Sequence, residues 1–173
     1  MMFGGTGRIP RILTAAENSG AAAVEFALFL PFFVLIIAGT FDLWYLIYSA
    51  SQLTSAVSAG ALYAANNATL ASTSAATLQS NIQSIVANAN GTNWATSTVD
   101  LNNGDVTHCF CPTGSLGSWL WGSTITCGTV CSGGGVAGQF VAITATRTLS
   151  PLIPTFGLTK NSAIMRRAMV QTQ

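Results

Sequence analysis

The residues best suited to chemistry in this sequence are four cysteines that fall within 23 positions: Cys109, Cys111, Cys127 and Cys131. An even number of cysteines in a short, loop-rich stretch predicts a disulfide framework if the compartment is oxidising. Cys109 and Cys111 are separated by one residue, so on a strand they would lie about 7 Å apart, which strains a bond between them. We therefore expect each to pair with Cys127 or Cys131, and two connectivities remain open.

Metal binding is an alternative use of the same region. Asp105 and His108 precede Cys109 and Cys111, and imidazole and thiolate groups are zinc ligands. An oxidising compartment favours disulfides over thiolates, so we expect no metal site and no cofactor. His108 is the single histidine, and Asp100 and Asp105 are the only acids after the first 42 residues. Because no set of nucleophile, base and acid is evident, we expect that the protein is not an enzyme.

Charged residues are scarce and unevenly distributed along the chain. They make up 6% of the 173 residues, and the formal net charge is +1. An ordinary soluble domain has about 25% charged residues. A nucleic-acid partner is excluded because it would need clustered lysines and arginines, and residues 43–99 contain no charge at all. This pattern is typical of a membrane or extracytoplasmic protein.

An apolar segment long enough to cross a bilayer occupies residues 21–41, which read AAAVEFALFLPFFVLIIAGTF and contain one charge, Glu25. As a helix the segment would be about 32 Å long, close to the hydrocarbon thickness. Arg8 and Arg11 precede it and Asp42 follows it. The positive-inside rule therefore predicts a cytoplasmic N-terminus, with the rest of the chain outside.

The apolar segment continues into an amphipathic pattern. Small and apolar residues recur at helical spacing: Leu43, Ile47, Ala50, Leu53, Val57, Ala61 and Ala64. This periodicity predicts one helix from about Ala21 to about Asn66. The apolar core is longer than that of an ordinary signal peptide and lacks a small-residue cleavage site at its end. A plain signal anchor followed by a separate domain helix is the simpler alternative.

The residues around Glu25 resemble a known processing motif. Gly20 to Phe26 read GAAAVEF. In type IV pilin-like subunits a glycine precedes the cut, and a glutamate followed by an aromatic residue stands fifth in the mature chain. The longer string SGAAAVEFALFLPFFVLIIAGTFDLWYLIYSASQLTSAVSAGALYAA is similar to TadE-like pilus-assembly proteins, the pseudopilins of the tight-adherence (Tad/Flp) pilus.

The resemblance implies a mechanism. A prepilin peptidase would cut between Gly20 and Ala21, and Phe26 and Glu25 would serve recognition and assembly. Implied partners are that peptidase, other pilin or pseudopilin subunits, the assembly platform and membrane lipid. The implied location is the bacterial inner membrane, single-pass, with a periplasmic or extracellular C-terminal domain, or the pilus itself. The implied role is a minor subunit in pilus assembly and cell adhesion. The alternative is a signal-anchored adhesive or binding module that does not polymerise.

The expected fold is α+β and pilin-like, with a long N-terminal helix followed by a small antiparallel sheet domain. We divide the chain into a leader (1–20), a transmembrane helix (21–42), an extracytoplasmic helical region (43–90) and a β-rich, disulfide-containing domain (91–173). Periodicity and turn residues predict a second helix and four strands. Their ranges are Thr73–Asn90 for the helix and Asp105–Cys111, Ser123–Cys127, Gln139–Leu149 and Ser162–Val170 for the strands. Trp119 and Trp121 either pack internally, which we favour, or form an aromatic patch for a partner or glycan.

Overall fold

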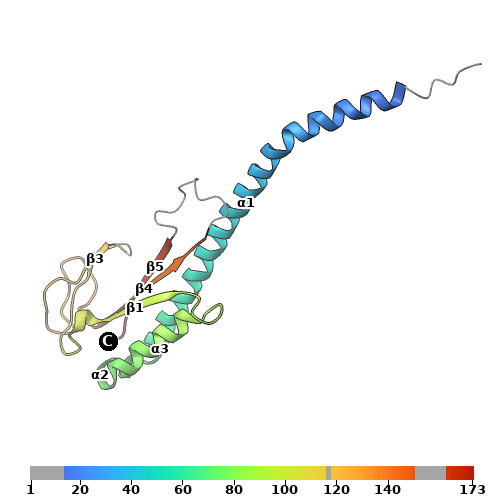
Figure 1. Cartoon of the computed structure of the whole chain (residues 1–173). Helices are drawn as coiled ribbons and strands as arrows, with labels where there is room; N and C mark the ends of the chain where they lie inside the picture. Colours follow the sequence, from blue (N-terminus) through green and yellow to red (C-terminus); the bar gives the residue numbers. More distant parts are fainter. Residues whose placement is uncertain (1–13, 116–117, 151–162) are drawn as a thin grey trace, which may run out of the picture.

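A computed structural model describes residues 14–115, 118–150 and 163–173. One long helix projects from a globular part that contains every other described element (Figure 1). The elements, in chain order, are α1 (Thr14–Asn66), α2 (Ala68–Thr73), α3 (Ala75–Ala87), β1 (Thr96–Leu101), the short 3-10 helix η1 (Asn102–Gly104), β2 (Thr113–Ser115), β3 (Ser118–Leu120), β4 (Phe140–Thr148) and β5 (Ala163–Gln171). The α+β fold with a long N-terminal helix is confirmed.

Helix α1 has 53 residues and runs through Pro31 without a break. Pro31 has no N–H group, so the carbonyl of Ala27 lacks its helical partner, a defect that bundles and membrane spans tolerate. The helix ends at Asn66 as expected, and the side-chain Nδ2 of Asn67 donates a 2.9 Å hydrogen bond to the carbonyl of Tyr63. The expected start near Ala21 was wrong, because the chain is already helical from Thr14.

The C-terminal half of α1 packs against the sheet and against α3. Its buried hydrophobic residues are Ala50, Leu53, Ala56, Val57 and Ala64, which include most of the stripe predicted from sequence. Leu43 and Ile47 belong to the same predicted stripe but are 46% and 58% exposed. The amphipathic pattern therefore extends further toward the apolar segment than the intramolecular packing does.

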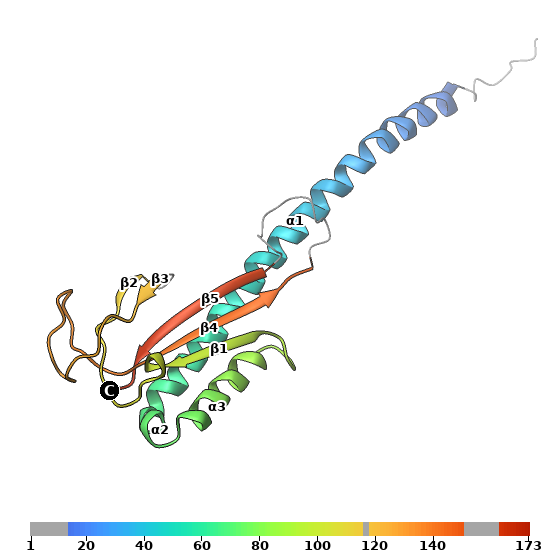
Figure 2. The ribbon, with the colours of Figure 1, turned by 60° about the vertical axis from the view of Figure 1, so that its left-hand side comes forward.

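The main sheet has three antiparallel strands in the order β1-β4-β5. Alternate residues of the strands point to opposite faces. Val99 and Ile143 are paired neighbours and are buried on the face that packs against α1 and α3. Figures 1 and 2 show both helices on this side and the hairpin of β2 and β3 on the other. The helices thus cover one face of the sheet only.

Two of the four predicted strands are confirmed. Strands β4 and β5 correspond to the predicted Gln139–Leu149 and Ser162–Val170, with Ser162 outside the described residues. The predicted strands Asp105–Cys111 and Ser123–Cys127 were wrong, since only an isolated bridge between Cys109 and Ile125 joins them.

The third strand of the sheet is β1, which we did not predict. Its sequence, TSTVDL, has the alternating burial of a half-covered strand, yet it contains a single large apolar pair among polar residues. The predicted helix Thr73–Asn90 is also shorter than expected. Ser74 has a non-helical φ of −153° before α3, and Asn88 closes the helix with a 3.0 Å side-chain bond to the Ser84 carbonyl.

Candidate functional site

The predicted processing motif lies in the N-terminal half of α1, which projects away from the globular part (Figure 1). Gly20, Ala21 and Glu25 are exposed, and Phe26 is 65% exposed. A Cβ atom placed on Gly20 would meet no neighbouring atom within 4 Å. Ala21 and Glu25 are four residues apart, so they lie on one helix face, separated by about 6 Å along the axis. The structure therefore presents the whole motif on one accessible helical stretch.

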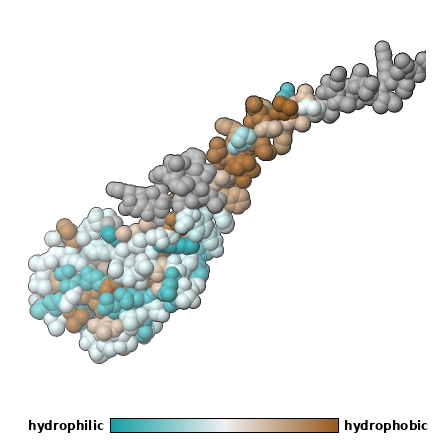
Figure 3. Space-filling model, viewed as in Figure 1, coloured by the Kyte–Doolittle hydropathy of each residue, from teal (hydrophilic) through white to brown (hydrophobic). Residues whose placement is uncertain are grey.

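An apolar surface surrounds and follows this motif. Large hydrophobic side chains from Val24 to Trp44 are exposed, and Figure 3 shows them as a brown band along the helix beside a mostly polar globular part. The helix from Gly20 is long and apolar enough to span a membrane. Its most apolar 18 residues have a mean hydropathy of 2.4, and none of them is buried. Glu25 is the only charged residue between Gly20 and Asp42.

A cluster around Arg147 ties the sheet to α1 just beyond this apolar surface. The guanidinium of Arg147 lies 4.2 Å from the ring centroid of Trp94 and 5.7 Å from that of Tyr45. It also donates a 3.0 Å hydrogen bond to the Tyr45 hydroxyl. The end of β4, the loop before β1 and helix α1 therefore meet at one cation.

Sequence reasoning missed the role of Arg147. The sequence does contain one indication. Arg147 is the first charged residue after an interval without charges, residues 106–146, and it lies near the end of a predicted strand. Arg166 also contacts α1, since its Nε donates a 3.3 Å hydrogen bond to the Thr54 hydroxyl. Arg166 thus helps to dock β5 on the helix.

Both pairs of cysteines form disulfides. Cys109 bonds to Cys127 and Cys111 bonds to Cys131, with Cα atoms 5.0 and 5.7 Å apart. This connectivity is one of the two that the spacing left open. Cys109 and Cys111 cannot act as the thiolate ligands of the alternative zinc site, because both sulfur atoms are in disulfide bonds.

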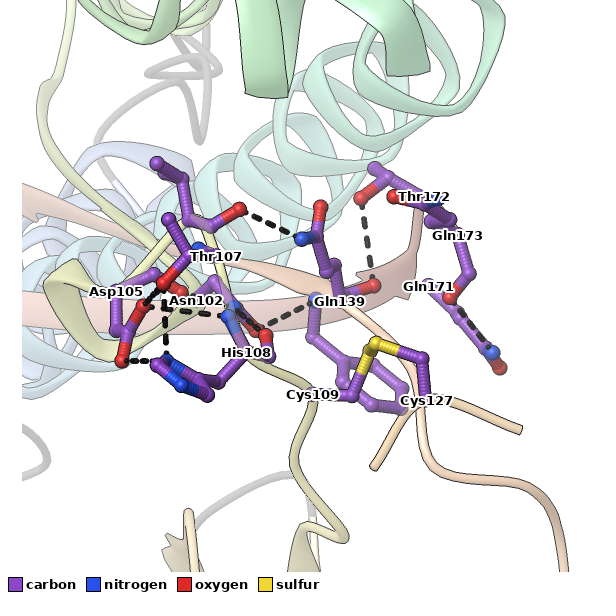
Figure 4. Close-up of a disulfide and its surroundings, with 12 residues drawn as sticks. Asn102, Asp105, Thr107, His108, Cys109, Cys127, Gln139, Gln171, Thr172 and Gln173 are labelled. Atoms are coloured by element: carbon purple, nitrogen blue, oxygen red, sulfur yellow. Dashed lines mark hydrogen bonds and ion pairs between the residues drawn. A yellow bond between two sulfur atoms is a disulfide. The ribbon is translucent and has the colours of Figure 1, made fainter. Parts of the chain in front are cut away.

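The loop before the first disulfide is organised by Asp105 (Figure 4). Its carboxylate accepts hydrogen bonds from the Thr107 hydroxyl at 2.7 Å and the Thr107 backbone N–H at 2.9 Å, and it lies 2.7 Å from Nδ1 of His108. These bonds, first of all those from Thr107, hold the pKa of Asp105 well below its usual range. The group acts as the anchor of a turn, which explains why residues 105–108 are not a strand.

Two buried amide side chains hold this loop on the sheet (Figure 4). Asn102 donates to the carbonyls of Asp105 and His108 and accepts a hydrogen bond from the backbone N–H of Phe140. Gln139 donates a 2.7 Å hydrogen bond to the carbonyl of Val106. Since both amides are nearly inaccessible, their polar groups are satisfied within the protein. The disulfide-bonded loops are thereby fixed at the start of β4.

Trp119 and Trp121 have different environments. Trp121 is half-buried and packs edge-on against Phe110, with ring centroids 5.8 Å apart. This contact confirms the packing interpretation for Trp121. Trp119 lies on β3, where the guanidinium of Arg167 is 5.7 Å from its ring centroid. The two rings therefore contact different neighbours.

The geometry defines a class of protein: a small α+β domain, closed by two disulfides, on an exposed apolar helix that could anchor it in a membrane. Residues 20–62 match the family model of TadE-like proteins, which identifies this stretch of the chain as TadE-like. The matched range begins at Gly20 and contains Glu25, Phe26 and most of α1. No curated protein and no solved structure matches the chain.

Proposed function

We propose that this protein is a minor pilin-like subunit, a pseudopilin, needed for assembly of a tight-adherence pilus. A prepilin peptidase cuts it between Gly20 and Ala21, and the mature subunit waits in the inner membrane before assembly. The observation that carries this proposal is the placement of Gly20, Ala21, Glu25 and Phe26 on an exposed helix at the start of the apolar surface. The role is structural, without catalysis.

Cleavage within a helix requires the peptidase to unwind it locally. Gly20 lowers the cost of unwinding, because glycine is less stable than alanine in a helix interior by about 1 kcal/mol. Gly20 also has no side chain to keep the peptidase from the backbone. Cutting there leaves the whole apolar surface, from Ala21 onward, on the mature subunit.

Glu25 then gives the mature subunit an assembly contact. A carboxylate within an apolar environment is costly unless it is paired or protonated. The new amine on Ala21 is one helical turn away and carries the opposite charge. When subunits pack side by side with an axial offset, the amine of one can reach Glu25 of its neighbour. Removing either partner would leave a buried charge, at a cost of about 3–5 kcal/mol.

The direct test is the N-terminal sequence of the mature protein from isolated membranes and pili. We expect Ala21 as the first residue. Gly20→Val should block the cut and leave a slower band on a gel. Because a side chain at Gly20 meets no other part of the described structure, the block would report on the peptidase rather than on misfolding. Ala27→Val is the matched control, since it places the same side chain two helical turns further on and should be processed normally.

The second candidate function is a signal-anchored binding module that does not polymerise. The disulfide-closed domain on a single apolar helix is equally suited to that role. Such a protein would keep residues 1–20 or be cut after the apolar segment. Either N-terminus, or normal processing of Gly20→Val, would reject the pseudopilin proposal.

A further inference from the structure

The sheet has a polar hollow on the face opposite the helices. Its volume is about 290 Å³. One wall is formed by Thr98, Asp100, Thr144 and Arg167 of the three-stranded sheet. The other wall is formed by Ser118 and Trp119 of β3. The hollow is separate from the processing motif, and no part of the proposed function uses it.

Strand register brings the sheet residues together. Thr98, Thr144 and Arg167 are paired neighbours across β1, β4 and β5. Asp100 lies two residues further along β1 and so points to the same face. Its partner across the sheet is Ala142, which is 4% exposed. Because alanine is small, the centre of the sheet remains low between the polar side chains and forms the floor of the hollow.

The hairpin of β2 and β3 is held over this floor by covalent and steric constraints. Cys111, two residues before β2, is bonded to Cys131. Gly114 has a φ of +107°, and a Cβ there would collide with the Ser118 carbonyl, so the tight pairing of β2 with β3 requires glycine. Arg167 lies over the indole of Trp119, which joins the two walls. The hollow is therefore a preformed feature of the fold.

The side chains in the hollow define the chemistry of its ligand. They supply one carboxylate, one guanidinium, three hydroxyls and one indole. The two charges cancel, so the site selects neither a strong anion nor a strong cation. Carboxylate and guanidinium groups can each make two directed hydrogen bonds to neighbouring hydroxyls, and an indole offers an apolar surface with a polar edge. A sugar ring has both an apolar face and a polar rim.

We propose that this hollow binds a neutral saccharide, one ring at a time, with Trp119 against the ring face and Asp100 and Arg167 on its hydroxyls. Its volume lies at the lower end of ligand pockets, which suits a single ring. Its sheet residues alternate with those that pack against α1, so the hollow lies on the opposite face of the sheet. It therefore stays accessible when α1 is in a membrane or packed among other helices.

The test is saturation-transfer NMR on the full chain in a zwitterionic detergent that carries no sugar headgroup. The probes are glucose, galactose, mannose and N-acetylglucosamine. We expect transfer to the ring protons of at least one sugar. Trp119→Ala and Asp100→Ala should each weaken binding by about tenfold or more. Trp44→Ala is the matched control, because it removes an exposed indole from α1 and should leave binding unchanged.

Three outcomes would overturn the proposal: no transfer to any of the four sugars, equal binding by the Trp119 and Asp100 variants, or displacement of the sugar by inorganic phosphate. The last would show that Arg167 holds anions instead. If Trp119→Ala disturbs the hairpin, sugar binding by the Asp100→Asn variant is the test instead, since this substitution keeps the size of the side chain. Cleavage at Gly20 is read from a different experiment, so failure here leaves the pseudopilin proposal standing.

Discussion

Glu25 and Arg147 are two of the few charged residues in this chain, and their surroundings are opposite. Arg147 lies between two aromatic rings and donates to a tyrosine hydroxyl, so its contacts are made within the molecule. Glu25 lies on an exposed apolar helix surface. Its surroundings in the folded chain do not explain why a carboxylate is there. The contact with a neighbouring subunit that we propose would explain it.

Replacement of Glu25 by Gln tests that contact at the residue scale. The amide keeps the size and shape of the side chain but cannot form an ion pair with an amine. We expect normal cleavage at Gly20 and a strong loss of assembly, because the buried amine of the neighbour would be left unpaired. The measurement is the yield of surface pili and the co-purification of other pilus subunits.

Glu17→Gln is the control for this experiment. It makes the same chemical change in the leader, which the mature subunit lacks under our proposal, so assembly should be unaffected. Wild-type piliation in the Glu25→Gln strain would remove Glu25 from the assembly mechanism.

The bonding of single residues could be predicted from sequence where covalent or steric limits apply to it. The one-residue spacing of Cys109 and Cys111 excluded a bond between them, and the structure agrees. The choice between Cys127 and Cys131 depends on how the loops lie against each other, and the Ile125 N–H donates a 2.9 Å hydrogen bond to the Cys109 carbonyl, which brings Cys127 beside Cys109. Contacts between residues so far apart in sequence leave no local pattern.

Helix α1 carries two different surfaces in succession, and Gly60 lies where the second is most closely packed. A Cβ at Gly60 would lie 3.0 Å from a methyl group of Val86, 3.2 Å from one of Ile82 and 3.4 Å from one of Ile143. Helix α1, helix α3 and strand β4 therefore approach one another at this glycine. The apolar half of α1 makes no comparable contact.

Gly60→Val should destabilise the globular part. The added Cβ and its two methyl groups exceed the space between α1 and α3, and overpacking of this kind costs about 1–3 kcal/mol. The free energy of unfolding, followed by tryptophan fluorescence in urea, measures the effect. Ala59→Val is the matched control, since Ala59 is exposed on the same helix and should lose only a few tenths of a kcal/mol through helix propensity. Equal stability of the two variants would contradict the packing described at Gly60.

At the scale of elements, sequence reasoning worked where hydrophobic periodicity is strong. The end of α1, the apolar face of α3 and strands β4 and β5 follow from it. Strand β1 was missed because its six residues carry little apolar pattern and owe their strand conformation to pairing with β4. The region around Asp105 was mistaken for a strand because side-chain hydrogen bonds, which periodicity does not register, bend it into a turn.

At the scale of the whole molecule, the chain combines an apolar helix with a domain stabilised by two disulfides. The disulfides close loops with sequence separations of 18 and 20, and each stabilises the small core by about 3 kcal/mol in the chain-entropy model. They can persist only in an oxidising compartment. The disulfides therefore place a condition on which side of the membrane the domain occupies, independent of the arginines near the N-terminus.

This condition predicts the thiol state of the protein in intact cells. When the cells are quenched in acid and the denatured protein is then labelled, all four cysteines should resist a polyethylene-glycol maleimide until a reductant is added. Cys111→Ser is the control, because it frees Cys131 and should add one label without reductant. Four labels on the unreduced wild type would place the domain in the cytoplasm and contradict the proposed orientation.

The continuity of α1 also has a mechanical consequence. The same helix forms the apolar anchor and, further along, runs beside β4 and β5 (Figure 2). A pull on the anchor therefore loads the interface between helix and sheet in shear, parallel to the strands, so that Leu53, Val57 and Ala64 share the force at the same time. Because α1 is one continuous helix, no loop lies between the anchor and the part that packs on the sheet. The domain should consequently withstand tension along α1 better than a peeling force applied to its C-terminal strand.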